Sequence, residues 1–158
     1  MTSADKEDIY DFYIFLHQKF KKNSNLFLSK QRWSELFSLL MKGRKEFWRV
    51  VGITPKALEL YRLNKFKTSK GLVRGHLNMR IKTFELFFST DDQLSYHEFW
   101  KLFKKYDPVI LMTKEENKSH DIPVYIKISN PKSNFFTNSG INWQLTKQDV
   151  ELLKSLKG

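Results

Sequence analysis

The stretch Gly71-Leu72-Val73-Arg74-Gly75-His76 is short and apolar, and it ends on the pair Gly-His. A short apolar run bounded by glycine is typical of a strand, so we expect a β-strand here that stops at His76. The run Pro108-Val109-Ile110-Leu111-Met112 predicts a second, buried strand. Outside these two runs most of the patterns are helical, and the sequence therefore predicts an α+β fold.

Helical patterns surround the two strands. Residues 5–21 carry apolar side chains at helical spacing, with acidic residues at the start and lysines at the end. Capping boxes at Ser95 and Thr113 predict the helix 96–106 and a short helix after residue 113, and Thr146 caps a last helix that ends at Leu156. The remaining expectations are a helix at 30–42, two short helices within 45–66, a helix or tight turn at 79–88, and a strand at 122–128.

The 158 residues suit one domain, or one domain with a small N-terminal appendage. We expect a helical, basic region over residues 1–70 and an α+β region over 71–158, with one compact domain overall as the alternative. The 41% apolar content supplies a core and excludes intrinsic disorder, and the absence of cysteine excludes disulfides and thiol catalysis. Because no membrane-spanning run or signal-peptide pattern is present, we expect a cytoplasmic protein. We expect no membrane partner, because Gly43, Gly52, Pro55 and Gly71 interrupt the basic segment that would have to form an amphipathic helix, and binding to an anionic membrane is the weakest alternative.

Positive charge is concentrated in one part of the chain. From Met41 to Lys82 there are 12 basic residues against 2 acidic ones, out of a net charge of +11 for the whole chain. Such a block is the expected footprint of a nucleic-acid binder, with DNA favoured over RNA, although a plain basic surface would have the same composition. The expected nucleic-acid contacts are Arg44, Lys45, Arg49, Thr54, Lys56, Arg62, Lys65, Arg74 and Arg80.

Within this block, residues 47–62 resemble the helix-turn-helix of DNA-binding proteins. The resemblance places Gly52 at the turn and Ile53 in the small core, and it directs the second helix, capped by Thr54, into the major groove. A plain helical hairpin is the alternative.

A second constellation begins at Arg74-Gly75-His76 and closes at residues 110–118, Ile-Leu-Met-Thr-Lys-Glu-Glu-Asn-Lys. It resembles a degenerate form of the ββα-metal nucleases, the HNH or His-Me finger family. The resemblance implies that His76 is the general base and that Asn117 is the final ligand of a divalent metal ion, with Mg²⁺ or Mn²⁺ expected. Glu116, beside Asn117, and His97 are further candidate ligands. As alternatives, His76 is an ordinary structural histidine, and helix-start preferences alone account for Glu116 and Asn117.

The leading hypothesis is a small metal-dependent endonuclease that binds and cleaves DNA, of the restriction or mobile-element type that the resemblance implies. One histidine and one metal ion supply what a phosphodiester needs, an activated water and a stabilised leaving oxygen. Cutting at palindromic sites would need two protomers, which makes a homodimer a candidate assembly. The alternatives are a non-catalytic DNA-binding protein, such as a regulator or a phage-type inhibitor, and a protein-interaction domain that uses its aromatic surface.

Overall fold

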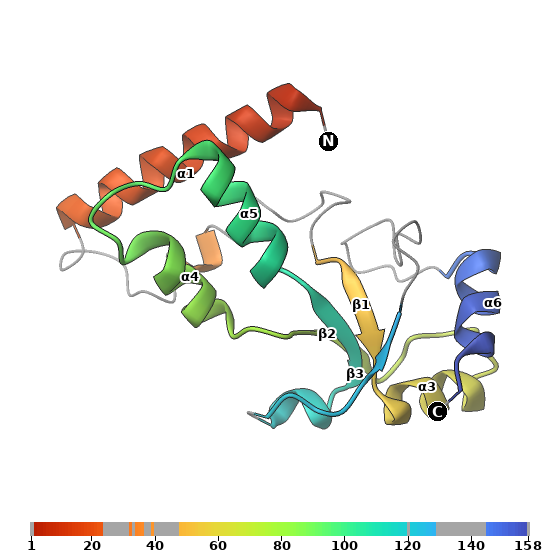
Figure 1. The fold of residues 1–158 in the computed structure, drawn as a ribbon. Helices are drawn as coiled ribbons and strands as arrows, with labels where there is room; N and C mark the ends of the chain where they lie inside the picture. The colour runs from red at the N-terminus through yellow and green to blue at the C-terminus, as the bar shows by residue number, and fades with distance from the viewer. Residues whose placement is uncertain are drawn as a thin grey trace. The chain divides into compact units, whose positions relative to one another are not determined.

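The structure is a computed structural model, and it describes residues 2–23, 32, 34–36, 39, 48–119, 121–128 and 145–157. Helices and a mixed sheet make up these residues (Figure 1), which confirms the expected α+β class. The chain forms two compact units that interleave in sequence. The helical unit combines Met1–Arg44 with Asn78–Asp107, and the sheet unit combines Lys45–Leu77 with Pro108–Gly158.

Four strands form the sheet of the sheet unit: β1 (Val50–Ile53), β2 (Leu72–His76), β3 (Val109–Thr113) and β4 (Ile126–Lys127). Their order is β2-β3-β1-β4. β3 runs parallel to β1 and antiparallel to β2, and β4 runs antiparallel to β1. β3 is buried from its first residue to Met112, because it has a strand on each side and side chains packed over both of its faces.

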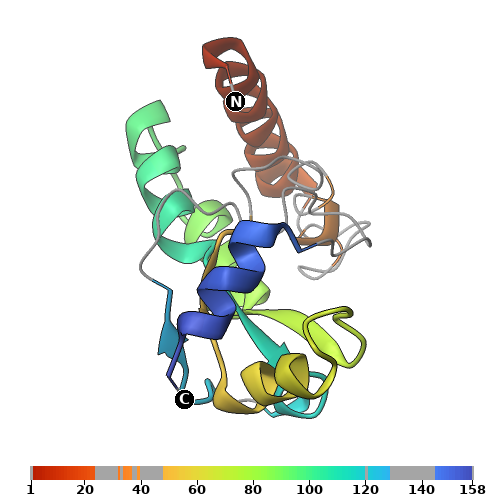
Figure 2. The same cartoon turned by 90° about the vertical axis from the view of Figure 1, so that its right-hand side faces the viewer.

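One face of this sheet is covered by α3 (Pro55–Leu63) and α6 (Lys147–Ser155), which lie in front of the strands in Figure 2. Thr54 caps α3, since its hydroxyl accepts a hydrogen bond from the Ala57 N–H at 3.1 Å, and Pro55 stands in the first turn, where no N–H is needed. The core between helices and strands consists of Val50, Ile53, Ala57, Leu58, Tyr61, Leu72, Val109, Leu111, Ile128 and Leu153.

Two glycines lie opposite each other on the other face of the sheet, on either side of Ile110. The Tyr125 ring packs directly on Gly52, where a Cβ would overlap the ring and stand 3.0 Å from the Ile126 carbonyl oxygen. The end of the Met112 side chain occupies the corresponding space over Gly75. A larger residue at either position would therefore displace the side chain that covers this face.

The helical unit consists of α1 (Ser3–Asn23), α4 (Arg80–Phe88) and α5 (Tyr96–Tyr106) among its described elements. Tyr13 of α1 is fully buried at its centre, with its ring centroid 4.8 Å from that of Phe99 and 5.6 Å from that of Phe88. The Tyr13 hydroxyl donates to the Phe87 carbonyl at 3.2 Å and accepts from the Leu94 N–H at 2.9 Å. An aromatic core thus holds the helices of this unit together. None of the helices within the described ranges is long and apolar enough to cross a bilayer.

Most of the expected elements are confirmed, including the strand that stops at His76 and the helix 96–106 with its Ser95 capping box. The strand expected at 122–128 is shorter, because only Ile126 and Lys127 pair with β1. Pro123 lacks the N–H that a continued ladder would require. The helix expected at 30–42 lies largely outside the described residues.

The helix-turn-helix prediction for residues 47–62 is wrong. Gly52 lies within strand β1 and not at a turn between two helices. The β-branched residues Val50, Val51 and Ile53 suit a strand, and the partners of this strand, β3 and β4, come from much later in the chain. Only the second half of the motif, the capped helix α3, is correct.

The boundary expected near residue 70 differs from the observed units and falls inside the sheet unit. The reason is that β1 pairs with β3, so residues 45–77 fold with the C-terminal part of the chain. Residues 78–107, which join β2 to β3, belong to the helical unit. The residues on either side of this inserted segment are joined by a hydrogen bond, which the Leu77 N–H donates to the Pro108 carbonyl at 3.1 Å.

His17 makes the stability of the helical unit depend on pH. It is buried in α1, and its Nε2 donates to the Thr90 carbonyl at 3.1 Å. Burial lowers the pKa of His17 from its ordinary value of 6.5, so the unfolded chain takes up the proton more readily than the folded one. The stabilising effect of neutral His17 is present above pH 6.5 and is lost as the pH falls below it. We expect a lower melting temperature at pH 5 than at pH 7.5 in thermal unfolding followed by circular dichroism.

The matched variants are His17→Gln, which keeps a donor for Thr90 but does not titrate, and His97→Gln at an exposed position of α5. The first variant should have a smaller difference in melting temperature between the two pH values, and the second should keep the wild-type difference. An unchanged difference in His17→Gln would contradict this account.

Candidate functional site

His76 is the last residue of β2 and pairs with Val109, the first residue of β3. The imidazole is half-buried, and β2 is an edge strand of the sheet. The ring of Trp48, which precedes β1, stands edge-on to the imidazole, with 5.7 Å between centroids and 84° between planes. The candidate general base is therefore held at one end of the sheet, where β1 and β3 begin and β2 stops.

Asn117 comes back to the same strand from beyond the far end of β3. It lies in the 3₁₀ turn η1 (Glu116–Lys118), which follows β3 as the Thr113 capping box predicts. The Asn117 amide oxygen lies 3.1 Å from the position that a Cβ on Gly75 would take. The fold thus brings the candidate metal ligand to the residue immediately before His76.

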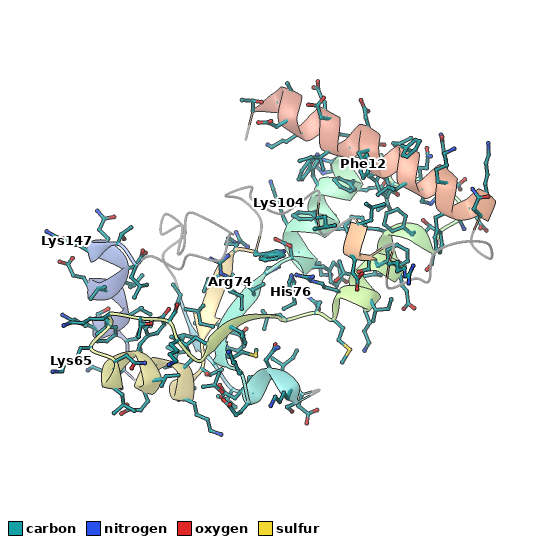
Figure 3. The ribbon with its side chains drawn as sticks, turned by 180° about the vertical axis from the view of Figure 1, so that it is seen from behind. Phe12, Lys65, Arg74, His76, Lys104 and Lys147 are labelled. Carbon is teal, nitrogen blue, oxygen red and sulfur yellow. The ribbon has the colours of Figure 1, made fainter. Side chains whose placement is uncertain are left out.

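The two candidate residues approach β2 from opposite faces. Side chains alternate along a strand, so the His76 imidazole lies on the face of Leu72 and Arg74, which α3 and α6 cover (Figure 3). Asn117 lies on the Gly75 face, together with Met112. A substrate that touches both groups would have to reach them around the outer edge of β2, which pairs with no other strand among the described residues.

Glu116 has a structural role that the Thr113 capping box predicted only in part. Its Oε2 accepts hydrogen bonds from the Thr54 hydroxyl at 2.8 Å and from the Thr113 N–H at 2.9 Å. It therefore ties the start of α3 to the end of β3. These two hydrogen bonds explain the position of the Glu116 carboxylate without a metal ion.

The side chains around His76 and Asn117 can be compared with the ligands that the implied metal ion requires. Among the described residues, no three His, Cys, Asp or Glu side chains come together as a metal site. The amide oxygen of Asn117 belongs to an exposed side chain, and Mg²⁺ commonly binds through one or two protein oxygens while keeping several waters. Asn117 therefore offers one oxygen ligand, which a Mg²⁺ or Mn²⁺ ion would have to supplement with waters and substrate oxygens.

The other candidate ligand, His97, is exposed on α5 in the helical unit, whereas His76 and Asn117 belong to the sheet unit. Arg80, a candidate nucleic-acid contact, is the first residue of α4 and also lies in the helical unit. The candidates Arg44 and Lys45 lie outside the described residues. The expected set is therefore divided between the two units and the residues outside the description.

Charge differs between the two units, although less sharply than between the block at 41–82 and the rest of the chain. The sheet unit carries 15 Lys and Arg against 7 Asp and Glu, a net charge of +8. The helical unit carries 13 against 10, a net charge of +3. Most of the excess positive charge therefore lies on the unit that contains His76.

The candidate nucleic-acid contacts of the sheet unit differ in the exposure of their side chains and in the hydrogen bonds that these side chains already make. Arg49, Lys56 and Lys65 are exposed, whereas Thr54 is fully buried, and its hydroxyl is used by Ala57 and Glu116. Arg62 is exposed, but its guanidinium donates to the Leu156 carbonyl at 2.9 Å. Thr54 and Arg62 thus hold the fold together, and the lysines are better placed for phosphate contact.

Arg74 lies two residues before His76 on the same face of β2 and is half-buried. Burial lowers the pKa of its guanidinium, which nevertheless stays charged at neutral pH. Burial raises the pKa of the neighbouring Tyr61, whose hydroxyl has no hydrogen-bond partner among the described residues. Sequence reasoning missed Trp48 and Tyr61, because both fall in the segment 45–66 that was expected to form two helices.

No protein-family model matches this chain, and neither a curated protein nor a solved structure is detectably similar to it.

The contact between Thr54 and Glu116 can be measured as stability. Thr54→Val removes both the cap of α3 and the donor to Glu116, so the free energy of unfolding in urea should fall by about 1–3 kcal/mol. Thr54→Ser keeps the hydroxyl and should lose less than about 1 kcal/mol. Equal stability of the valine variant and the wild type would show that the bridge contributes nothing.

Proposed function

We propose that this chain is a metal-dependent endonuclease that acts on nucleic acid, with DNA as the favoured substrate. The observation that carries the proposal is the return of Asn117 to Gly75, the residue before His76. An antiparallel pair of strands followed by a short helical turn brings these residues together, although about forty residues separate them in the sequence. The resemblance implies an order of strand, strand and short helix, and the order of β2, β3 and η1 supports the proposal in this respect.

Binding would begin with the positive charge of the sheet unit. Its net charge of +8 includes the exposed side chains of Arg49, Lys56 and Lys65. Lys and Arg side chains displace the counterions condensed on a phosphate backbone, and this release favours association. We also propose a cytoplasmic location for the chain. A restriction or mobile-element role would follow from the same resemblance, and cutting at palindromic sites would need a homodimer.

His76 would act as the general base. A neutral imidazole accepts a proton near pH 7, and this one is half-buried at the end of an edge strand. Arg74, on the same face, would orient the phosphate through its charged guanidinium. Asn117, with Glu116 beside it, would hold Mg²⁺ or Mn²⁺. The ion, when bound, stabilises the charge that develops on the leaving oxygen.

A non-catalytic nucleic-acid-binding protein is the second candidate function. Two observations favour it: His76 and Asn117 lie on opposite faces of β2, and Oε2 of Glu116 is already used by Thr54 and Thr113. This alternative requires the same positive surface but no metal ion. The two functions therefore differ in cleavage and not in binding.

Cleavage is tested with mixed plasmid and genomic DNA in Mg²⁺, Mn²⁺ or EDTA. We expect the wild-type chain to cut only with metal, and we expect His76→Ala to lose about 100-fold or more of the rate while its DNA affinity is unchanged. His97→Ala, at an exposed position of the helical unit, is the matched histidine control and should cut at the wild-type rate. Tight binding without any cutting of DNA or RNA would favour the non-catalytic function.

Binding by the sheet unit is tested through its dependence on salt. Lys56→Ala should weaken the association constant and reduce the slope of log K against log salt concentration by about one, because one phosphate contact is lost. Lys101→Ala, an exposed lysine of α5 in the helical unit, is the control and should leave the slope unchanged. Equal effects of the two substitutions would contradict a binding surface confined to the sheet unit.

A further inference from the structure

Trp48 has a backbone conformation that is unusual for a large side chain. Its φ is 56°, in the left-handed region that favours glycine. Residues held in this region need surrounding contacts that keep them there, and they occur preferentially at functional sites. The conformation therefore raises the question of what the indole contacts.

The indole contacts His76. The two rings are perpendicular, with 5.7 Å between centroids, an edge-to-face geometry that aromatic rings favour. The backbone brings them together at one end of the sheet. The Val109 N–H donates to the Arg49 carbonyl at 3.0 Å, next to Trp48, and Val109 also pairs with His76. β3 therefore fixes the spacing between the segment that carries the indole and the strand that carries the imidazole.

We propose that Trp48 is a positioning residue that holds the imidazole of His76 in the orientation needed for proton transfer. The inference rests on the proposed nuclease function. The left-handed turn at Trp48 directs the indole across the beginning of β3, where it limits rotation of the imidazole. General-base catalysis depends on such orientation, because a displacement of about 1 Å can reduce a rate about 100-fold. Trp48 itself exchanges no proton.

Phe66 provides a close control within the same unit. It also has φ of 56°, and it is also a half-buried aromatic residue packed against the core of the sheet unit. Its ring, however, stacks on Tyr61, with 6.2 Å between centroids and 10° between planes. Loss of either ring should loosen the core to a similar degree, but only the loss of Trp48 should affect His76.

The experiment compares three variants of the full chain: Trp48→Phe, Trp48→Gly and Phe66→Gly. Glycine removes the ring without strain at a positive φ. Cleavage of a DNA oligonucleotide in Mg²⁺ gives kcat and KM, and two-dimensional NMR spectra record the imidazole C–H signals, with those of His76 assigned from His76→Gln. Circular dichroism checks that each variant is folded.

We expect Trp48→Gly to reduce kcat by about 10- to 100-fold while KM stays within about twofold, because the substrate-binding residues are unchanged. Trp48→Phe should retain most of the rate, and Phe66→Gly should cleave nearly as fast as the wild type. The His76 signals should shift in Trp48→Gly, whereas the His97 signals should not.

A wild-type kcat in Trp48→Gly, or an equal loss in Phe66→Gly, would overturn the positioning role while leaving the nuclease function intact. Unshifted His76 signals in Trp48→Gly would also overturn it. A wild-type chain that binds DNA but never cuts it would overturn the proposed function, and the positioning role with it.

Discussion

Strand β3 is hydrogen-bonded on both sides, and the arrangement of the sheet unit depends on this double pairing. Its parallel partner β1 carries the chain from Trp48 toward the capped helix α3, and its antiparallel partner β2 ends at His76. The backbone groups of a buried strand must be paired, because leaving them without partners costs free energy. β3 therefore determines where the residues that flank β1 and β2 meet.

The end of β3 is fixed by a second set of polar contacts. Thr113 and Glu116 form a capping box, and the same carboxylate oxygen of Glu116 accepts a hydrogen bond from Thr54 at the start of α3. The turn that follows brings Asn117 back beside Gly75. A bulky residue in place of this glycine would occupy the space of Met112 and Asn117. The absence of a side chain at Gly75 is thus as important for the site as the side chains around it.

The two units differ in the core that stabilises them and in their net charge. The helical unit is held by an aromatic core centred on Tyr13, and its opposite charges nearly balance. The sheet unit carries most of the excess positive charge together with His76 and Asn117. Residues 78–107 are inserted between the two strands that the site depends on.

Local signals in the sequence determined the ends of several elements. The Gly-His pair predicted the end of β2, and side chains that pair with nearby N–H groups predicted the starts of α3, α5 and α6. Such signals act within a few residues, so they can be recognised without a tertiary structure. The pairing of β1 with β3 depends on residues far apart in the chain, and for this reason residues 47–62 resembled a helix-turn-helix. The same long-range packing alone decided that Trp48 contacts His76, that Thr54 binds Glu116 and that Asn117 lies beside Gly75.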